Sequence, residues 1–162
     1  MQSNQFSMID VEAFAARFYI NKDTGQPRPL LLTPYAYNIT FASLAQGATA
    51  TGTINISANA DFILLMLHHR AQIGAAQNIS TKTAPFVRVL ITDSGSGEQF
   101  TNSAVDVENY STNGNIINAL SYPRIIAGRS SLTVQVTNFA PTAETYTSLD
   151  LMFDGVQVRA YQ

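Results

Sequence analysis

The chain has 162 residues, with nine Lys and Arg against eleven Asp and Glu, and a formal net charge of −2. This length fits a single domain that can bury about 70% of the surface of its unfolded chain. Because no basic run is present to neutralise a phosphate backbone, the composition argues against nucleic acid as a partner. The absence of cysteine excludes disulfides, thiolate metal sites and cysteine nucleophiles.

The first 34 residues read as an appendage to the rest of the chain. The segment "SMIDVEAFAARF" (7–18) predicts either a short helix or an extended arm. Three prolines then follow, Pro27, Pro29 and Pro34, which favour an extended connection. We therefore divide the chain into an N-terminal arm (1–34) and a sandwich domain (35–162), and the arm can lie across its own sheet or contact a neighbour.

From residue 35 onward, apolar and polar residues alternate with the period of half-buried strands. The predicted strands are 35–41, 50–57, 86–93, 131–138 and 146–161. Turn segments rich in Gly, Asn, Asp and Ser separate them, without a long helical pattern between. The fold class predicted is all-β: an antiparallel β-sandwich of jelly-roll type with an N-terminal arm or short helix.

Two segments depart from this alternation. The run "FILLML" is apolar on both faces, with Phe62, Leu64 and Met66 expected on one face and Ile63, Leu65 and Leu67 on the other. Something must cover both faces, so these six residues are the candidate subunit interface, unless the arm covers them. The second departure is "NALSYPRIIAGRSS" (118–131), where Pro123 and Gly128 predict an irregular entry into the next strand.

Few side chains suggest chemistry. The two histidines, His68 and His69, are adjacent and should point to opposite faces of a strand, so they cannot jointly hold a metal. Two acidic pairs stand close in sequence: Asp93 with Glu98 around "SGSG", and Asp106 with Glu108, which a strand would place on one face. Paired carboxylates can serve as the acid and base of a glycosidase or bind calcium, but the spacing of Asp93 and Glu98 does not match a calcium loop, and short loops of this composition are more often solvated turns. We predict no catalytic residue, metal or cofactor, and no enzyme activity.

The chain resembles the small jelly-roll virion proteins of tailed bacteriophages, in particular the capsid decoration or cement proteins. The segments that carry the resemblance are "LTPYAYNITFASLAQGATATGTINI" (32–56), "SYPRIIAGRSSLTVQVTNFA" (121–140) and "YTSLDLMFDGVQV" (146–158). The resemblance implies a structural protein on the capsid exterior of a virion. It also implies binding to the major capsid protein, bridging of capsomers and assembly as a homotrimer.

A second interpretation is a carbohydrate- or receptor-binding module of a phage tail or fibre, because jelly rolls are common lectin scaffolds. Sugar platforms use exposed aromatic rings, and the chain contains no tryptophan. Tyr110 and Tyr122 are the candidate replacements. The longest apolar run, "FILLML", is too short to cross a membrane, so no membrane-spanning segment is expected. The first residues lack the basic and apolar regions of a signal peptide, so no export signal is expected either.

Overall fold

The computed structural model describes residues 8–74, 80–82, 84–109, 111 and 119–160. The elements within them are α1 Met8–Phe18, β1 Leu30–Leu44, β2 Thr49–Asn55, β3 Asp61–Ile73, β4 Ser80–Lys82, β5 Val87–Asp93, β6 Val105–Asp106, the short 3-10 helix η1 Val107–Asn109, β7 Ala119–Ile126, β8 Ser131–Asn138 and β9 Tyr146–Ala160. Neither described helix has the length and apolarity that crossing a membrane requires. The prediction of an all-β sandwich with an N-terminal arm or short helix is confirmed, and of these two alternatives the segment forms the helix.

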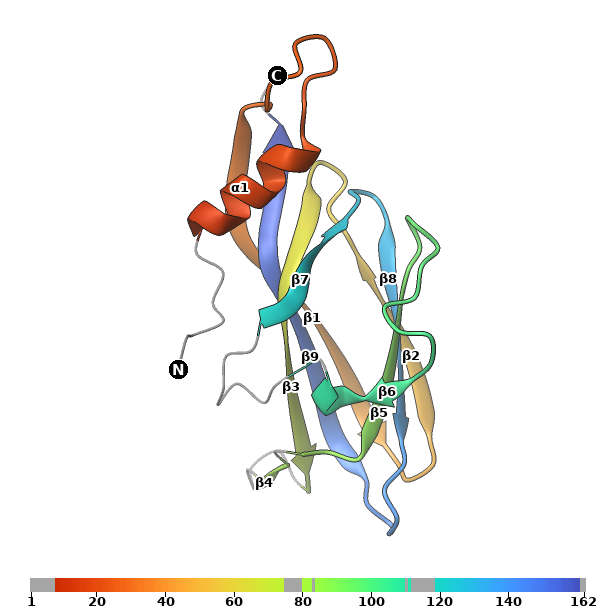
Figure 1. Cartoon of the computed structure of the whole chain (residues 1–162). Coiled ribbons are helices and arrows are strands. Elements are labelled where there is room, and N and C mark those ends of the chain that lie inside the picture. Colours follow the sequence, from red (N-terminus) through yellow and green to blue (C-terminus); the bar gives the residue numbers. More distant parts are fainter. Residues whose placement is uncertain (1–7, 75–79, 83, 110, 112–118, 161–162) are drawn as a thin grey trace.

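Two antiparallel sheets form the sandwich (Figure 1). One sheet has the order β1, β9, β3, and the far edge of β3 pairs with β7 over its first half and with the short β4 over its second half. The other sheet has the order β2, β8, β5, β6. With β4 set aside, the eight strands pair first with last, second with seventh, third with sixth and fourth with fifth. This nested antiparallel pairing is the jelly-roll topology that the sequence predicts.

Because apolar and polar residues alternate, every second side chain of a strand points into the space between the two sheets. Along β8, Leu132, Val134 and Val136 are fully buried, and Val89 and Ile91 of the neighbouring β5 lie in the same core cluster. The rings of Phe62 and Phe153, from the facing sheet, fill the same space. The predicted strand 131–138 therefore coincides with β8, because its apolar face has a complete opposing layer.

The two faces of "FILLML" differ from the prediction. A register shift in β3 between Leu64 and Met66 inserts one extra residue, so the alternation changes phase there. Leu67, rather than Met66, joins Phe62 and Leu64 in the core between the sheets. Met66 packs with the outer cluster instead. The predicted assignment of Met66 and Leu67 was wrong because period-two reasoning does not anticipate a bulge.

Helix α1 covers the outer face of the sheet formed by β1, β9 and β3 (Figure 1). Val11 and Ala15 of the helix are 1% and 0% exposed, and they pack in one cluster with Ile63 and Leu65 of β3. Val156 and Val158 of β9 complete this buried cluster. The apolarity on both faces of β3 is thus accounted for within one chain: sandwich core on one face, helix on the other.

The predicted boundary at residue 34 falls inside a strand. β1 begins at Leu30, and its first five residues pair with β9, including Pro34 opposite Val156. A proline is tolerated here because β1 is an edge strand, where a missing N–H costs no ladder bond on the open side. The prolines at 27 and 29 do precede the strand, as expected for an extended connection.

The predicted irregularity around Pro123 is present, but it lies inside a strand. Residues 119–126 form β7, which pairs antiparallel with the first half of β3. Leu64 and Met66 of β3 pair with Arg124 and Ala119, so residues 120–123 of β7 have no partner in β3. Pro123 lies in this unpaired stretch, where its missing N–H breaks no ladder bond. Gly128 does occupy a bend: a Cβ there would lie 2.9 Å from the carbonyl oxygen of Ala60.

Candidate functional site

Three aromatic side chains gather where α1 meets β7, and we call Phe14, Phe18 and Tyr122 the aromatic surface. The rings of Phe14 and Phe18 have centroids 4.8 Å apart, and the Phe14 and Tyr122 rings meet edge to face at 5.4 Å. Tyr122 is 62% exposed and Phe18 is 53% exposed. Phe14 and Phe18 are one helical turn apart, so α1 presents them on the same side.

Two shallow hollows flank this surface. One, of about 240 Å³, lies toward the start of α1, and the other, of about 310 Å³, lies toward the turn that follows β5. Phe14, Tyr122 and Pro123 line both hollows, so the Phe14–Tyr122 ring contact forms the ridge between them. An apolar ridge between two hollows is a shape into which side chains of a partner can pack.

Polar groups lie on the far side of the larger hollow. Asp93, Ser96 and Glu98 contribute to its lining, together with Phe100. The guanidinium of Arg124 stacks over the Phe100 ring, with its central carbon 4.3 Å from the ring centroid. The hollow therefore joins aromatic faces to hydroxyl and carboxylate groups, the combination that stacks on and hydrogen-bonds a sugar ring.

A second cluster joins serine, histidine and glutamate. His69 Nδ1 lies 2.7 Å from Ser111 Oγ, and its Nε2 lies 3.3 Å from Glu108 Oε1. A hydrolase uses such a chain of groups to activate a serine. A nucleophile must also reach its substrate, and here His69 and Ser111 are each only 3% exposed. The geometry fits a structural role, in which the bonds fasten η1 and Ser111 to the sheet.

The neighbouring histidine occupies the opposite face of β3. His68 Nε2 lies 3.8 Å from Asp154 Oδ2, whereas its Nδ1 is buried without a hydrogen-bond partner among the described residues. The prediction that the two histidines point to opposite faces is confirmed. Both lie within β3, which continues to Ile73. No group of three or more metal-ligating side chains occurs in the described part of the chain.

The two acidic pairs behave differently in the structure: Asp93 and Glu98 stay close, since the Asp93 N–H donates to the Glu98 carbonyl at 2.9 Å, whereas Asp106 and Glu108 have different partners. Asp93 is buried, and its carboxylate accepts hydrogen bonds from the Gly95 N–H and the Ser96 hydroxyl, both at 2.9 Å. Asp106 instead faces Arg88, at 3.3 Å. The expectation that Asp106 and Glu108 share a face was wrong, because β6 ends at Asp106 and the chain turns into η1.

The candidate subunit interface at Phe62, Ile63, Leu64, Leu65, Met66 and Leu67 is covered by the chain itself: five of the six are at most 8% exposed, and Met66 is partly buried. Of the two candidate tyrosines, Tyr122 is the most exposed ring of the aromatic surface, and Tyr110 lies outside the described residues. Sequence reasoning missed Phe14 and Phe18 as surface residues. Their spacing of four was the available signal, but it fitted the buried face of a helix equally well.

A scan of the sequence against protein-family models gave no match, and a search of curated proteins gave none either.

Proposed function

We propose that the chain is a non-enzymatic structural virion protein that binds the outside of a phage capsid and stabilises the shell by bridging capsomers. The observation that carries this proposal is the aromatic surface of Phe14, Phe18 and Tyr122. The partner in this proposal is the major capsid protein. The jelly-roll topology is compatible with this role, but proteins of many unrelated functions share this fold. The proposal therefore rests on the aromatic surface and not on the fold.

Exposed aromatic rings favour a protein partner for two reasons. Aromatic residues are enriched among the few side chains that dominate interface energies, and a rigid ring loses little conformational entropy on binding. Only 12% of the residues are charged. Covering the surface with a partner therefore carries a small free-energy cost for desolvating charged groups. A subunit that binds only the assembled shell stabilises it by about 2.7 kcal/mol per site at 100 times its dissociation constant.

The proposal retains a homotrimer as the bound form, since threefold closure matches threefold positions on an icosahedral shell. The "FILLML" segment does not support a trimer, because helix α1 and the sandwich core cover these residues within one chain. A trimer would have to use other surfaces, such as the exposed edge of β1, where Tyr35 is 45% exposed.

Co-sedimentation with capsids tests this function. Virions of the phage that encodes the chain, stripped of it, are mixed with purified wild-type protein or with the double variant Phe18→Ser, Tyr122→Ser. We expect the wild type to pellet with the shells and the variant to bind at least about tenfold more weakly, as loss of two anchor rings predicts. Met152→Ser, at an exposed apolar side chain of β9 away from the aromatic surface, is the control and should bind normally. A wild-type protein that stays in the supernatant would contradict the proposal.

Binding of a glycan is the second candidate, favoured by one observation: Tyr122 borders a hollow that also contains Ser96 and Glu98. In that case the unmodified protein should bind a defined set of glycans on an array, and Tyr122→Ser and Glu98→Gln should each abolish this binding. Capsid binding without glycan binding favours the structural role, and the reverse result favours the carbohydrate-binding module.

A further inference from the structure

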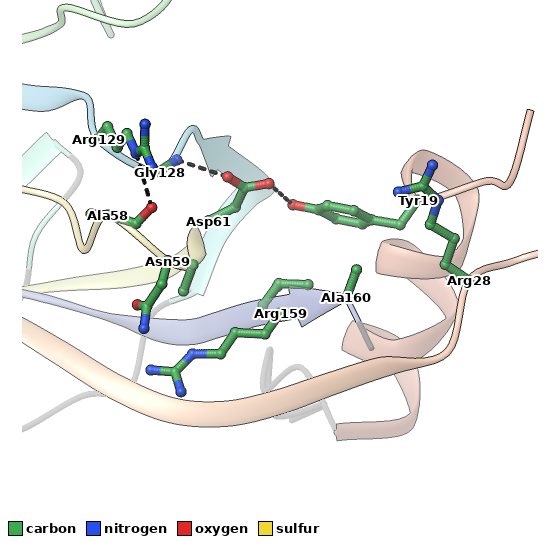
Figure 2. Close-up of a pocket in the computed structure, with 11 residues that line it drawn as sticks. Tyr19, Arg28, Ala58, Asn59, Asp61, Gly128, Arg129, Arg159 and Ala160 are labelled. Carbon is green, nitrogen blue, oxygen red and sulfur yellow. Dashed lines mark hydrogen bonds between the residues drawn. The ribbon is translucent and has the colours of Figure 1, made fainter. Parts of the chain in front are cut away.

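One edge of the sandwich is built from uncharged residues. Residues 29–60, which include β1, the turn after it and β2, contain no Asp, Glu, Lys, Arg or His. The charged residues on either side of this stretch, Arg28 and Asp61, line the same hollow at one end of the sandwich (Figure 2). The uncharged stretch therefore leaves one end of the molecule along β1 and returns to it along β2.

Both strands of this stretch lie at the edge of a sheet. Among the described residues, β1 pairs only with β9 and β2 pairs only with β8. The two edges adjoin, since a Cβ at Gly52 of β2 would lie 2.5 Å from the Ile39 side chain of β1. By contrast, the edge strands on the other side of the sandwich, β6 and β7, contain Asp106 and Arg124. The absence of charge is therefore a property of one edge of the sandwich and not of all its edges.

The open edge of β1 favours pairing with another strand. Alternate N–H and C=O groups of β1 point away from β9, and no strand in the described part of the chain pairs with them. β1 is 15 residues long, whereas strands in globular proteins usually have about 5–6 residues. Proteins commonly block such edges with charged side chains, prolines or bulges. Pro34 and Ser43, whose φ is +57°, bracket residues 35–42, which contain none of these devices.

A second copy of the same chain is the partner that this edge fits best. Recognition of a different protein commonly relies on complementary charge, which this edge lacks. Two copies of one antiparallel edge, in contrast, match donor to acceptor about a twofold axis, and here no like charges meet across that axis. Pairing about the middle of the stretch would also place aromatic and β-branched side chains opposite one another, namely those of Tyr35, Tyr37, Ile39 and Phe41.

We propose that two copies of the chain associate by antiparallel pairing of residues 35–42 of β1 about a twofold axis, which makes their sheets continuous. β1 and β7 lie at opposite edges of the sheet, so this contact leaves the aromatic surface free to bind a shell. The inference goes beyond the proposed function and does not depend on it, because a twofold contact is separate from a threefold assembly. Self-association and co-sedimentation with capsids can therefore succeed or fail independently.

Sedimentation equilibrium over a series of protein concentrations tests for the pair. We expect the mass of the wild type to approach that of two chains as the concentration rises. Asn38 is exposed and lies in the middle of the paired stretch, so Asn38→Lys and Asn38→Asp each bring two like charges together across the axis. Each variant should weaken the association about tenfold. Unchanged melting temperatures would show that these variants lose association and not folding.

The matched control is Met152→Lys, at the exposed residue of β9 that pairs with Asn38. Its two copies would stand about three strand spacings apart, or roughly 14 Å, where salt screens their repulsion, so it should associate like the wild type.

A mixture of the two Asn38 variants identifies the contact as self-pairing. The variants carry opposite charges at position 38, so an equimolar mixture should recover the association that each variant loses alone. A wild type with the mass of one chain at every concentration, or of three chains, would overturn the proposal. Equal association of all variants, or a mixture that stays dissociated, would overturn it as well.

Discussion

The two sides of helix α1 differ in what covers them. On the inward side, Val11 and Ala15 are 1% and 0% exposed and lie against Ile63. On the outward side, Phe18 is 53% exposed and stands beside Tyr122, which is 62% exposed. One short helix thus covers an apolar sheet face while it contributes rings to an uncovered surface.

This difference separates stability from binding. The covered cluster removes apolar side chains from water in the isolated chain, so its contribution appears as free energy of unfolding. The exposed rings of the aromatic surface contribute little to the fold, and under the proposed function their apolar area is buried when the partner binds. Substitutions on the two sides of the helix should therefore affect different measurements.

The largest effect is expected from a charge placed under the helix. Val11→Asp buries a carboxylate against Ile63 and Leu65 without a partner and should lower the free energy of unfolding by about 3–5 kcal/mol, as measured by urea denaturation. Ala13→Asp puts the same charge on an exposed position of the same helix. Equal losses in the two variants would show that α1 is not docked as described.

A cavity under the helix should have the next largest effect. Ile63 is fully buried in the outer cluster, so Ile63→Ala removes its packing and should cost about 2–5 kcal/mol in the same denaturation experiment. Ile20→Ala, at a side chain that is 43% exposed, is the control and should change the free energy of unfolding by less than about 0.5 kcal/mol. A small effect of Ile63→Ala would mean that the helix leaves this face open.

A smaller effect is expected at the end of the covered region, where the Tyr19 hydroxyl donates to Asp61. Burial, followed by the hydrogen bond to Asp61, raises the pKa of Tyr19 well above its ordinary value of about 10. The folded state therefore favours the neutral phenol, so this stabilisation is fully present below pH 10 and is lost as the pH rises above it.

Tyr19→Phe removes this contribution. It should lower the free energy of unfolding by about 1.5 kcal/mol at neutral pH. The difference between wild type and variant should shrink as the pH is raised beyond 10, in denaturation curves collected from pH 7 to 11. Burial also raises the pKa of Tyr146, so the free energy of unfolding of both the wild type and the variant will fall at high pH. Only the difference between the two proteins therefore reports on Tyr19. A difference that grows with pH would be incompatible with the hydrogen bond.

The smallest effect on stability is expected on the aromatic surface. Tyr122→Ser should change the free energy of unfolding by less than about 0.5 kcal/mol, because most of its ring is exposed. The matched substitution at a buried ring, Phe153→Ala, should cost about 3–5 kcal/mol. A large loss from Tyr122→Ser would place the ring in the fold and not in a binding surface.

The sequence predicted the regular parts of this fold well. Alternation located β5, β8 and β9 over their whole lengths, since each has one face in the core and one nearer to solvent. It did not extend β1 through Pro34, which lies in an edge strand where a missing N–H is tolerated, and it did not place the predicted irregularity at Pro123 inside a strand. It also failed at Met66 and Leu67, where a bulge changes the phase of the alternation.

The candidate sites were much less predictable. Phe14 and Tyr122 are far apart in the sequence, and only the docking of α1 beside β7 brings their rings together. The contact of His69 with Ser111 also depends on tertiary packing. No local pattern marks such residues, whereas every buried strand residue repeats the same local pattern.

The most direct test of the difference between the two sides of α1 is hydroxyl-radical footprinting of the protein, free and bound to capsids, with oxidation read at each residue by mass spectrometry. The account predicts that Phe18 and Tyr122 are readily oxidised in the free protein and protected on the shell, while Val11 and Ile63 are protected in both states. Oxidation of Phe18 and Tyr122 that does not change on binding, with protection appearing on another face, would contradict it.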